Sequence, residues 1–304
     1  SGFGTSEMDL RDFEYLAGKY RQVKFVVCQK MWGGFGSVLD LMWRCPNVYL
    51  DTSWLHMRDT IELVRHEFGI GRMLFGIGFK SHYGAAIGTL AHANITPDER
   101  EAIAHGNLER LLGMEPLTKK LAVEPPLLEE KPLWKKFRDG GKLDDFKVYD
   151  VHGHSGLHTR GWFLRDGDPE TYLETLARHM DGNGVDTLFL SGEEALFGDV
   201  LPGNRKLEEY AKSYPGRFRG YFVYNPMYKD ELSTAVLDDF FSRGFWAGFK
   251  LLPSYWHVRI TDPAFDPVWE YAEKHCLPVL IHTWNDSWNS PSMLRDIVKK
   301  YPNA

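Results

Sequence analysis

Three histidines stand at the ends of two predicted strands. His152 and His154 follow the apolar run 146–151 in a His-Gly-His sequence, and His282 closes a second run, 277–281. Residues two apart on a strand point to the same side, so His152 and His154 present their imidazoles together. With His282 they supply three nitrogen ligands, a set that holds Zn²⁺ and leaves one position open for water or substrate. The alternative is that His-Gly-His is a surface loop.

Further polar and aromatic residues follow the same strand ends. Asn225, Trp256 and Trp284 come after predicted strands and would share one rim, because the carboxyl ends of parallel strands meet at one edge. They are candidate substrate-binding residues, and aromatic loops there suggest a pocket for a ring or an acyl chain. Packing between loops accounts for them equally well. Glu193 and Glu194 lie on this edge too, where we expect solvated loop carboxylates; contact with the substrate or with the residues that bind it is the alternative.

The elements that position these residues alternate between strand and helix. Alternation with helices of about 10 residues favours parallel β/α units. Three strands precede residue 113 and five follow residue 146, which sums to the eight of a barrel. The predicted strands are 23–28, 47–51, 72–76, 148–151, 185–190, 219–223, 247–251 and 277–281.

A proline-rich, charged stretch interrupts this alternation. Four prolines and several charged pairs fall between residues 114 and 145, which is typical of a linker, with room for a short helix at its end. We therefore divide the chain into residues 1–113, a linker at 114–145, and residues 146–304.

Several motifs of residues 146–304 occur together in one known superfamily. They are His152 with His154, Asn204 with the sequence at 214–218, the Gly-Phe-Lys at 248–250, and the run at 277–282. In combination they resemble the amidohydrolase superfamily, in the branch of amidohydrolase-related barrels that includes aminocarboxymuconate-semialdehyde decarboxylase. The resemblance implies a (β/α)8 TIM-barrel fold, with residues 146–304 as strands one to five. It also implies that Lys250 lines the pocket or binds a substrate carboxylate; a carbamylated, metal-bridging Lys250 is the alternative.

Residues 9–113 resemble strands six to eight of the same family. Gly33-Gly34 and the segment 106–112 fit its pattern. The chemistry differs, because Gln29 stands about where the family has a histidine and Gly78 stands where it has a metal-binding aspartate. An amide does not titrate near neutral pH, so Gln29 is no general base. We expect this segment to be the C-terminal half of a degenerate barrel.

Two arrangements of these halves are open. The helix near 294–301 resembles the helix at 10–20, and one barrel needs that helix once. The interpretation we adopt is a piece of a tandem-repeat protein, with strands six to eight of one repeat followed by strands one to five of the next. The alternative is a single circularly permuted barrel, which would have three metal ligands, no general base and feeble hydrolysis.

Composition excludes several classes of partner. The net charge of −6 without a basic stripe argues against nucleic acid, and no apolar run approaches the roughly 20 residues of a membrane span. Three scattered cysteines are typical of reduced thiols, so we expect a cytoplasmic protein. The expected partner is a small-molecule substrate, together with self-association or packing of one repeat on the other.

The leading functional prediction is a metal-dependent hydrolase. Zn²⁺, or another divalent ion, would activate a water that attacks a C–N or C–O bond. One alternative is nonoxidative decarboxylation, which the same branch performs. The other is a pseudoenzyme or scaffold, because residues 9–113 lack two of the family's groups.

Overall fold

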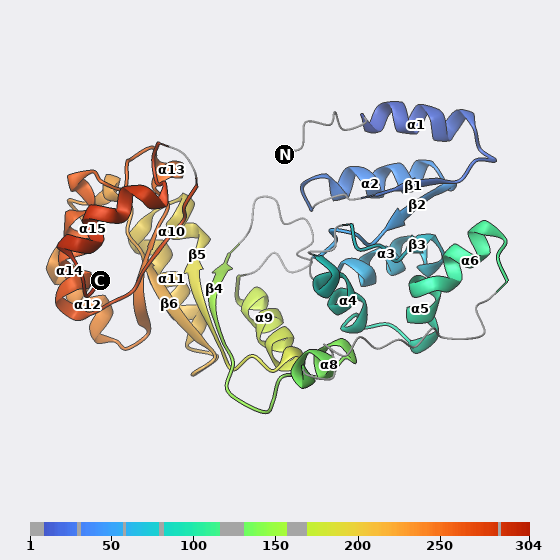
Figure 1. The fold of residues 1–304 in the computed structure, drawn as a ribbon. Helices are drawn as coiled ribbons and strands as arrows, with labels where there is room; N and C mark the ends of the chain where they lie inside the picture. The colour runs from blue at the N-terminus through green and yellow to red at the C-terminus, as the bar shows by residue number, and fades with distance from the viewer. Residues whose placement is uncertain are drawn as a thin grey trace. The chain divides into compact units, whose positions relative to one another are not determined.

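The computed structural model describes residues 9–28, 32–56, 59–78, 82–115, 131–156, 169–284 and 287–304. The chain divides into two compact units, unit 1 (Ser1–Gly141) and unit 2 (Lys142–Ala304). Both consist of parallel strands that alternate with helices (Figure 1). Among the described helices, none combines the length and the hydropathy that crossing a membrane requires.

Unit 1 contains a three-stranded parallel sheet in the order β1 (Phe25–Val27), β2 (Val48–Asp51) and β3 (Met73–Leu74). The predicted strands are all present, although β3 is shorter than expected. The described helices of this unit are α1 (Leu10–Lys19), α2 (Trp32–Arg44), α3 (Thr60–Phe68), η1 (Ile70–Arg72), α4 (Tyr83–Ala91), α5 (Pro97–Glu101), η3 (Ala102–Gly106), α6 (Asn107–Leu112) and α8 (Pro132–Arg138).

Side-chain caps fix both ends of α1. Asp9 accepts a hydrogen bond from the backbone N–H of Arg11 at the first turn. At the other end, the buried amide of Asn47 donates to the carbonyl oxygens of Ala17 at 3.1 Å and Tyr20 at 3.2 Å. Asn47 immediately precedes β2, so these bonds tie the end of α1 to the start of a central strand.

A π-helical turn joins α5 to α6. Thr96 and Glu99 form a capping box at the start of α5. The pair Gly106-Asn107 is typical of a helix end, but the π-helical turn carries the chain straight into α6. Asn107 is buried and donates to the carbonyl oxygens of residues 70 and 73 at 2.9 and 2.8 Å. These bonds anchor the side chain, so the asparagine does not end the helix.

The stretch expected to be a linker contributes a packed helix to unit 1. Helix α8 lies against two glycines of α4: a Cβ at Gly84 would stand 3.0 Å from Trp134, and one at Gly88 would stand 2.7 Å from Phe137. The glycines thus allow close approach of the two rings. The division between the units falls at Gly141, within the predicted linker.

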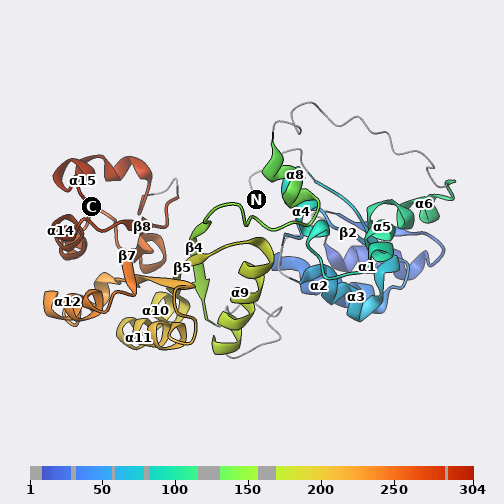
Figure 2. The same ribbon diagram turned by 90° about the horizontal axis from the view of Figure 1, so that it is seen from below.

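Unit 2 contains a five-stranded parallel sheet, with its strands in chain order. In Figure 2, α9, α11, α12 and α14 follow one another around the outside of a curled sheet, which gives half a barrel. The strands are β4 (Tyr149–Ser155), β5 (Thr187–Gly192), β6 (Phe218–Val223), β7 (Trp246–Leu251) and β8 (Val279–Ile281). The described helices are α9 (Pro169–Asn183), α10 (Glu193–Phe197), α11 (Val200–Ala211), η4 (Pro226–Tyr228), α12 (Thr234–Ser242), α13 (Pro253–Trp256), η5 (Pro263–Phe265), α14 (Asp266–His275), η6 (Pro291–Leu294) and α15 (Arg295–Lys300).

The core of unit 2 lies between this sheet and its helices. Phe222 of β6 packs edge-on against Phe240 of α12 and Trp246 of β7, at ring-centroid distances of 4.9 and 5.5 Å. Burial of a ring of this size contributes roughly 1.5–3 kcal/mol. Asn204 of α11 is also buried: it donates to the carbonyl oxygen of Val223 and accepts from its N–H. This reciprocal pair fixes the carboxyl end of β6.

The described strands pair as one three-stranded and one five-stranded sheet. Their number agrees with the eight strands expected from the sequence. The tandem-repeat and permuted arrangements both remain predictions.

Candidate functional site

The alternation of side chains along β7 defines the two faces of the sheet in unit 2. Phe249 and Leu251 are fully buried in the cluster that the outer helices cover. Lys250 lies between them and therefore points to the opposite, concave face. Ser191 of β5 lies on the same concave face, because its neighbour Leu190 belongs to the helix-covered cluster. Both Lys250 and Ser191 are buried there.

The two histidines of β4 also face the concave side. A Cβ at Gly153 would stand 2.8 Å from the side chain of Leu190, so Gly153 faces the core and its neighbours His152 and His154 face away from it. The register of β4 against β5 shifts between Asp150 and Gly153; irregularities of this kind redirect side chains and are frequent near functional sites. The two imidazole centroids are 5.2 Å apart.

The side chains of the concave face converge across the sheet. Lys250 Nζ lies 3.1 Å from His152 Nε2. Two strands, β5 and β6, separate β4 from β7, and at about 4.8 Å per strand a flat sheet would place these strands about 14 Å apart. The contact therefore depends on the curl of the sheet and on the reach of the lysine.

Burial controls the charges of this pair. It lowers the pKa of Lys250 to about 8. The pKa of His152 is also lowered, first by burial and then by the positive charge of Lys250. A neutral imidazole can accept a hydrogen bond from the ammonium group, which accounts for their contact. Among the described residues, no carboxylate pairs with Lys250. A buried cation without a counter-charge is costly, so the site is suited to an anion.

His282 lies one residue beyond β8. The backbone N–H of His282 donates to the carbonyl oxygen of Leu251, and the side-chain amide of Asn289 donates to the carbonyl oxygen of His282. Its ring lies 5.2 Å from that of Tyr255 and 5.4 Å from that of Trp284. Within the described ranges, no group of three or more His, Cys, Asp or Glu side chains is arranged to hold a metal ion. The structure thus brings together His152, His154 and Lys250, and the three-histidine set stays a prediction.

One residue expected to be solvated is part of the buried edge. Glu194 is only partly exposed, and it pairs with Lys206 at 2.6 Å, as a surface carboxylate should. The expectation is wrong for Glu193, which is 8% exposed and whose pKa burial raises to about 7. A Cβ at Gly156 would stand 3.1 Å from the Glu193 Cβ, so this carboxylate packs against the loop that leaves β4. The adjacent glutamates give no sequence signal for their different depths.

The other predicted substrate-binding residues take different positions on the rim. Asn225 is buried and its Oδ1 accepts from the Met227 N–H at 3.1 Å, which caps η4. Trp256 donates through Nε1 to the carbonyl oxygen of Leu196, which fixes α13 against α10. Trp284 is exposed.

The corresponding edge of unit 1 is filled by packing. Gly78 has a φ of +67°, and a Cβ there would stand 2.5 Å from Trp54 Nε1. The aspartate of the family therefore has no room at this position unless Trp54 moves. Trp54 in turn contacts the ring of His82 at 5.1 Å. Asp51, at the end of β2, accepts from the hydroxyl of Ser53 at 2.5 Å. Gln29 lies outside the described residues.

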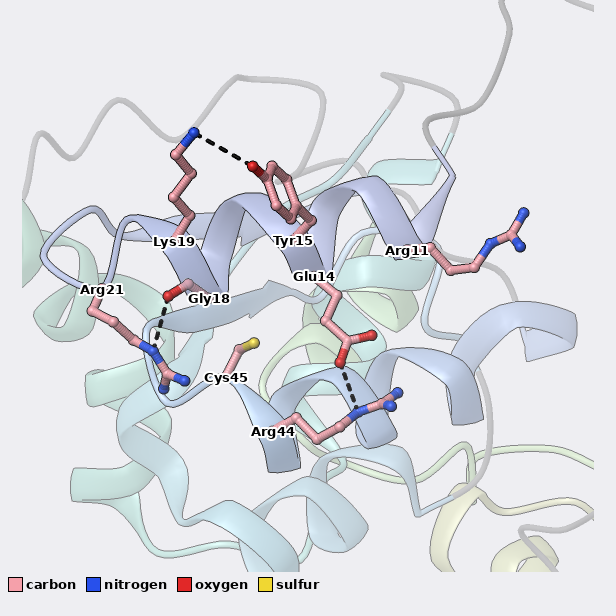
Figure 3. Close-up of a pocket in the computed structure, with 8 residues that line it drawn as sticks. All are labelled: Arg11, Glu14, Tyr15, Gly18, Lys19, Arg21, Arg44 and Cys45. Carbon is pink, nitrogen blue, oxygen red and sulfur yellow. Dashed lines mark hydrogen bonds and ion pairs between the residues drawn. The ribbon is translucent and has the colours of Figure 1, made fainter.

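A hollow of about 520 Å³ lies between α1 and α2 of unit 1 (Figure 3). Its basic side chains have separate partners: Lys19 donates to the Tyr15 hydroxyl, whereas Arg21 donates to the carbonyl oxygen of Gly18. Figure 3 shows these side chains pointing in different directions, so they do not converge on one ligand. The lining residues are Arg11, Glu14, Tyr15, Gly18, Lys19, Arg21, Arg44 and Cys45.

Comparison with known proteins gives one family match. Residues 3–114 match the family model Amidohydro_2, described as amidohydrolase. This amidohydrolase match lies in unit 1, the part in which we predicted strands six to eight. The predicted resemblance is confirmed for that segment, while the branch of the superfamily remains a prediction.

No curated protein matches the chain. Among solved structures, the chain is similar to a probable 2-pyrone-4,6-dicarboxylic acid hydrolase from Acinetobacter baumannii, crystallised with citric acid bound. The identity is 14% and the TM-score 0.35, over 45% of this chain and 50% of that one. The chain therefore spans about half the length of the solved structure that it matches.

Proposed function

We propose that the concave face of unit 2 carries part of a metal-dependent hydrolase site of the amidohydrolase type. The main support is the contact between His152 and Lys250, which joins strands β4 and β7 over the concave face. A buried cation beside a pair of imidazoles is suited to binding and polarising an anionic substrate.

In this proposal His152, His154 and His282 hold Zn²⁺ or another divalent ion. The donors present fit such an ion in part. The lowered pKa of His152 favours the neutral, ligating form, and His154 lies beside it on the same face. Strand alternation puts His282 on that face too, because Leu280 is in register with Lys250. A bound ion would act as a Lewis acid and activate water for attack on a C–N or C–O bond.

The remaining residues of the site bind the substrate and hold a proton. The Lys250 ammonium pairs with an anionic group of the substrate and so gains the counter-charge that the described residues do not supply. Glu193 titrates near neutral pH and can hold a proton at the same edge. Asn225, Trp256 and Trp284 contribute to the rim around the substrate.

Zinc uptake tests this proposal. Metal-free protein titrated with Zn²⁺ should bind it stoichiometrically, as measured by calorimetry and metal analysis. His152→Ala and His282→Ala should each lose this binding. His275→Ala is the matched control, because His275 is an exposed histidine at the end of α14, and it should bind zinc like the unmodified chain. An unmodified chain that binds no zinc would contradict the proposal.

A second function is proposed for unit 1, which we infer to be a non-catalytic scaffold. Trp54 occupies the space that an aspartate side chain at Gly78 would need. Unit 1 would then serve to pack one repeat on the other or to self-associate. His56→Ala and His82→Ala should leave zinc uptake unchanged; loss of zinc in either variant would show that unit 1 takes part in metal binding.

The two sheets also support the tandem-repeat arrangement. A five-stranded and a three-stranded parallel sheet correspond in number to strands one to five and six to eight of a barrel. We propose that they belong to successive barrels. The coding sequence beyond residue 304 tests this: we expect a strand that ends in histidine and is followed by Gly-Gly. The circularly permuted barrel predicts no such strand.

A further inference from the structure

The π-helical turn η3 of unit 1 places His105 between two glutamates. His105 Nε2 lies 2.8 Å from Glu101 Oε2 in α5, and His105 Nδ1 lies 3.1 Å from Glu109 Oε2 in α6. An ionised carboxylate only accepts hydrogen bonds, so the two bonds together require a proton on both ring nitrogens, which is the imidazolium form. We call Glu101, His105 and Glu109 the His105 cluster.

The two carboxylates of the His105 cluster differ in depth. Glu101 is exposed, whereas Glu109 is only 8% exposed. A carboxylate is costly to bury unless it is hydrogen-bonded and paired with a positive charge. The imidazolium of His105 therefore stabilises Glu109 in its buried position. In return the two carboxylates raise the pKa of His105, and the hydrogen bond with Glu109 is the larger cause.

The other charges around η3 are directed elsewhere in the described part of the chain. The elements that pack most closely against η3 are α5, α6, η1 and β3, and β3 carries no titratable side chain. The remaining charged residues of these elements are Glu99, which pairs with Arg65; Arg100, which donates to the carbonyl oxygens of Leu90 and Ala93; Arg110, which donates to Asn107 and to the carbonyl oxygen of Gly71; Arg72, which donates to the carbonyl oxygens of Met42 and Cys45; and Asp98, about two helical turns before His105. The charge of His105 thus depends on Glu101 and Glu109.

The segment that carries His105 also holds β3 in place. The N–H of Phe75, the residue after β3, donates to the carbonyl oxygen of Ile103 at 3.0 Å. On the other side of His105, the amide of Asn107 donates to the carbonyl oxygen of Met73 at 2.8 Å. Because β3 lies at the edge of the three-stranded sheet, with β2 on one side, it depends on these bonds for its attachment.

We propose that the His105 cluster is a pH-sensitive contact, which holds η3 against β3 while the imidazole is protonated and releases it as the pH rises. The pKa of His105 is raised above its ordinary value of 6.5. The stabilisation is therefore fully present below about pH 6.5 and is lost as the pH rises through the raised pKa. One ring nitrogen then loses its proton, and one of the two glutamates loses its bond to the ring. Since β3 leads directly to Gly76 and Gly78, the pH would control how firmly the carboxyl edge of unit 1 is held.

Amide hydrogen exchange of the full chain, measured by NMR, tests this proposal. The readout is the protection of the Phe75 N–H, which is its exchange rate relative to an unstructured peptide at the same pH. Between pH 6 and pH 9 this protection should fall by about three- to tenfold, the factor that two partly exposed ion pairs supply. The internal reference is the Phe25 N–H, which donates to the carbonyl oxygen of Asn47 between β1 and β2 and should keep its protection.

His105→Gln should remove the pH dependence, because glutamine does not titrate, and Phe75 should show the weaker protection at both pH values. His66→Gln is the matched control. His66 is an exposed histidine that bonds to one carboxylate, that of its neighbour Glu67, and its replacement should leave the pH dependence of Phe75 intact. The same fall in Phe75 protection in His105→Gln as in the unmodified chain would overturn the proposal, as would no fall in the unmodified chain.

A second variant does not depend on the fold tolerating a change at His105. Glu101 is exposed, so Glu101→Gln should keep the fold while it removes one of the two negative charges beside the ring. The pKa of His105, followed through the chemical shifts of its ring protons, should fall in this variant and fall further in Glu109→Gln. A His105 pKa that neither variant lowers would show that the cluster does not hold the proton, and the proposal would be wrong.

Discussion

The carboxyl edges of the two sheets differ in the side chains that fill them. In unit 1, Trp54 covers Gly78 and Asp51 is hydrogen-bonded to Ser53. In unit 2, the side chain of Lys250 is buried with His152 as its hydrogen-bond partner, and no carboxylate of the described residues pairs with it. The same alternation of strand and helix therefore supports a filled edge in one unit and a polar, charged edge in the other.

The difference shows that a degenerate site is more than a missing ligand. At Gly78 the neighbouring indole and the backbone conformation are both adapted to glycine. Restoring the ligand alone would therefore not restore the site. In unit 2 the buried charges of Lys250 and Glu193 reduce stability, which is typical of a site kept for function.

The largest expected effect is that of Gly78→Asp. The new side chain meets Trp54, and the substituted residue must keep a left-handed backbone conformation. The free energy of unfolding of unit 1 should therefore fall by about 2–5 kcal/mol. Gly113→Asp is the control, because Gly113 has a similar φ of +63° with nothing within 4 Å of a Cβ. It isolates the conformational cost, about 1 kcal/mol. Denaturant unfolding measures both; equal losses would show that Trp54 does not fill the edge.

Lys250→Met should have the opposite sign in unit 2. Methionine keeps most of the buried volume and removes an ammonium group that lacks a counter-charge, so stability at neutral pH should rise by about 1–3 kcal/mol. Lys274→Met, at an exposed position of α14, should change it by less than about 0.5 kcal/mol. If Lys250→Met destabilised the protein instead, the lysine charge would be satisfied within the fold, and the site would need no anionic ligand.

The sequence predicts the strands, and it predicts polar residues at the carboxyl edge of the unit 2 sheet, because local patterns specify both. Alternating apolar runs identify the strands, and the His-Gly-His spacing places His152 and His154 on one face. The contact of His152 with Lys250 spans 98 residues and depends on the curl of the sheet, which no local pattern specifies.

The sequence does not predict the burial of Glu193 or the packing of helix α8, because both depend on tertiary structure. Glu193 and Glu194 are adjacent and chemically identical, yet only Glu193 is buried. Helix α8 lies in a stretch whose prolines and charges are typical of a linker, and its position depends on two glycines about 50 residues earlier in the chain, Gly84 and Gly88.

Glu193→Gln should alter the pH dependence of stability. Burial raises the pKa of this carboxyl from 4.5 to about 7, so the folded state binds the proton more tightly than the unfolded state does. Its contribution to stability is thus present at low pH and is lost as the pH rises from about 4.5 through about 7. Glutamine removes that loss, and the variant should be about 2–3 kcal/mol more stable than the unmodified chain at pH 8.

The control for this prediction is the neighbouring Glu194→Gln. Glu194 is partly exposed and paired with Lys206, so its replacement should change stability by at most about 1 kcal/mol. Unfolding curves between pH 4 and pH 8 compare the two variants. Parallel pH profiles for Glu193→Gln and the unmodified chain would mean that Glu193 is as solvated as its neighbour, and unit 2 would lose one of its buried charges.

The smallest expected change in stability is that of Gly18→Ala, which tests where unit 1 has space for an added side chain. Gly18 lies in α1, beside the hollow of Figure 3, and a Cβ there would have nothing within 4 Å. Gly18→Ala should therefore gain helix propensity without a clash and stabilise unit 1 by about 0.5–1 kcal/mol.

Gly88→Ala in α4 is the matched helical glycine, but its Cβ would stand 2.7 Å from Phe137. We expect that variant to lose stability, because the ring must move away from α4. Thermal unfolding measures the change in stability of both variants. A gain for Gly18→Ala and a loss for Gly88→Ala would show that unit 1 is tightly packed under α8 and has free space beside α1. A gain in both would mean that Phe137 moves aside at little cost, so that α8 does not pack tightly against α4. Unit 1 would then be less tightly packed than its filled edge implies.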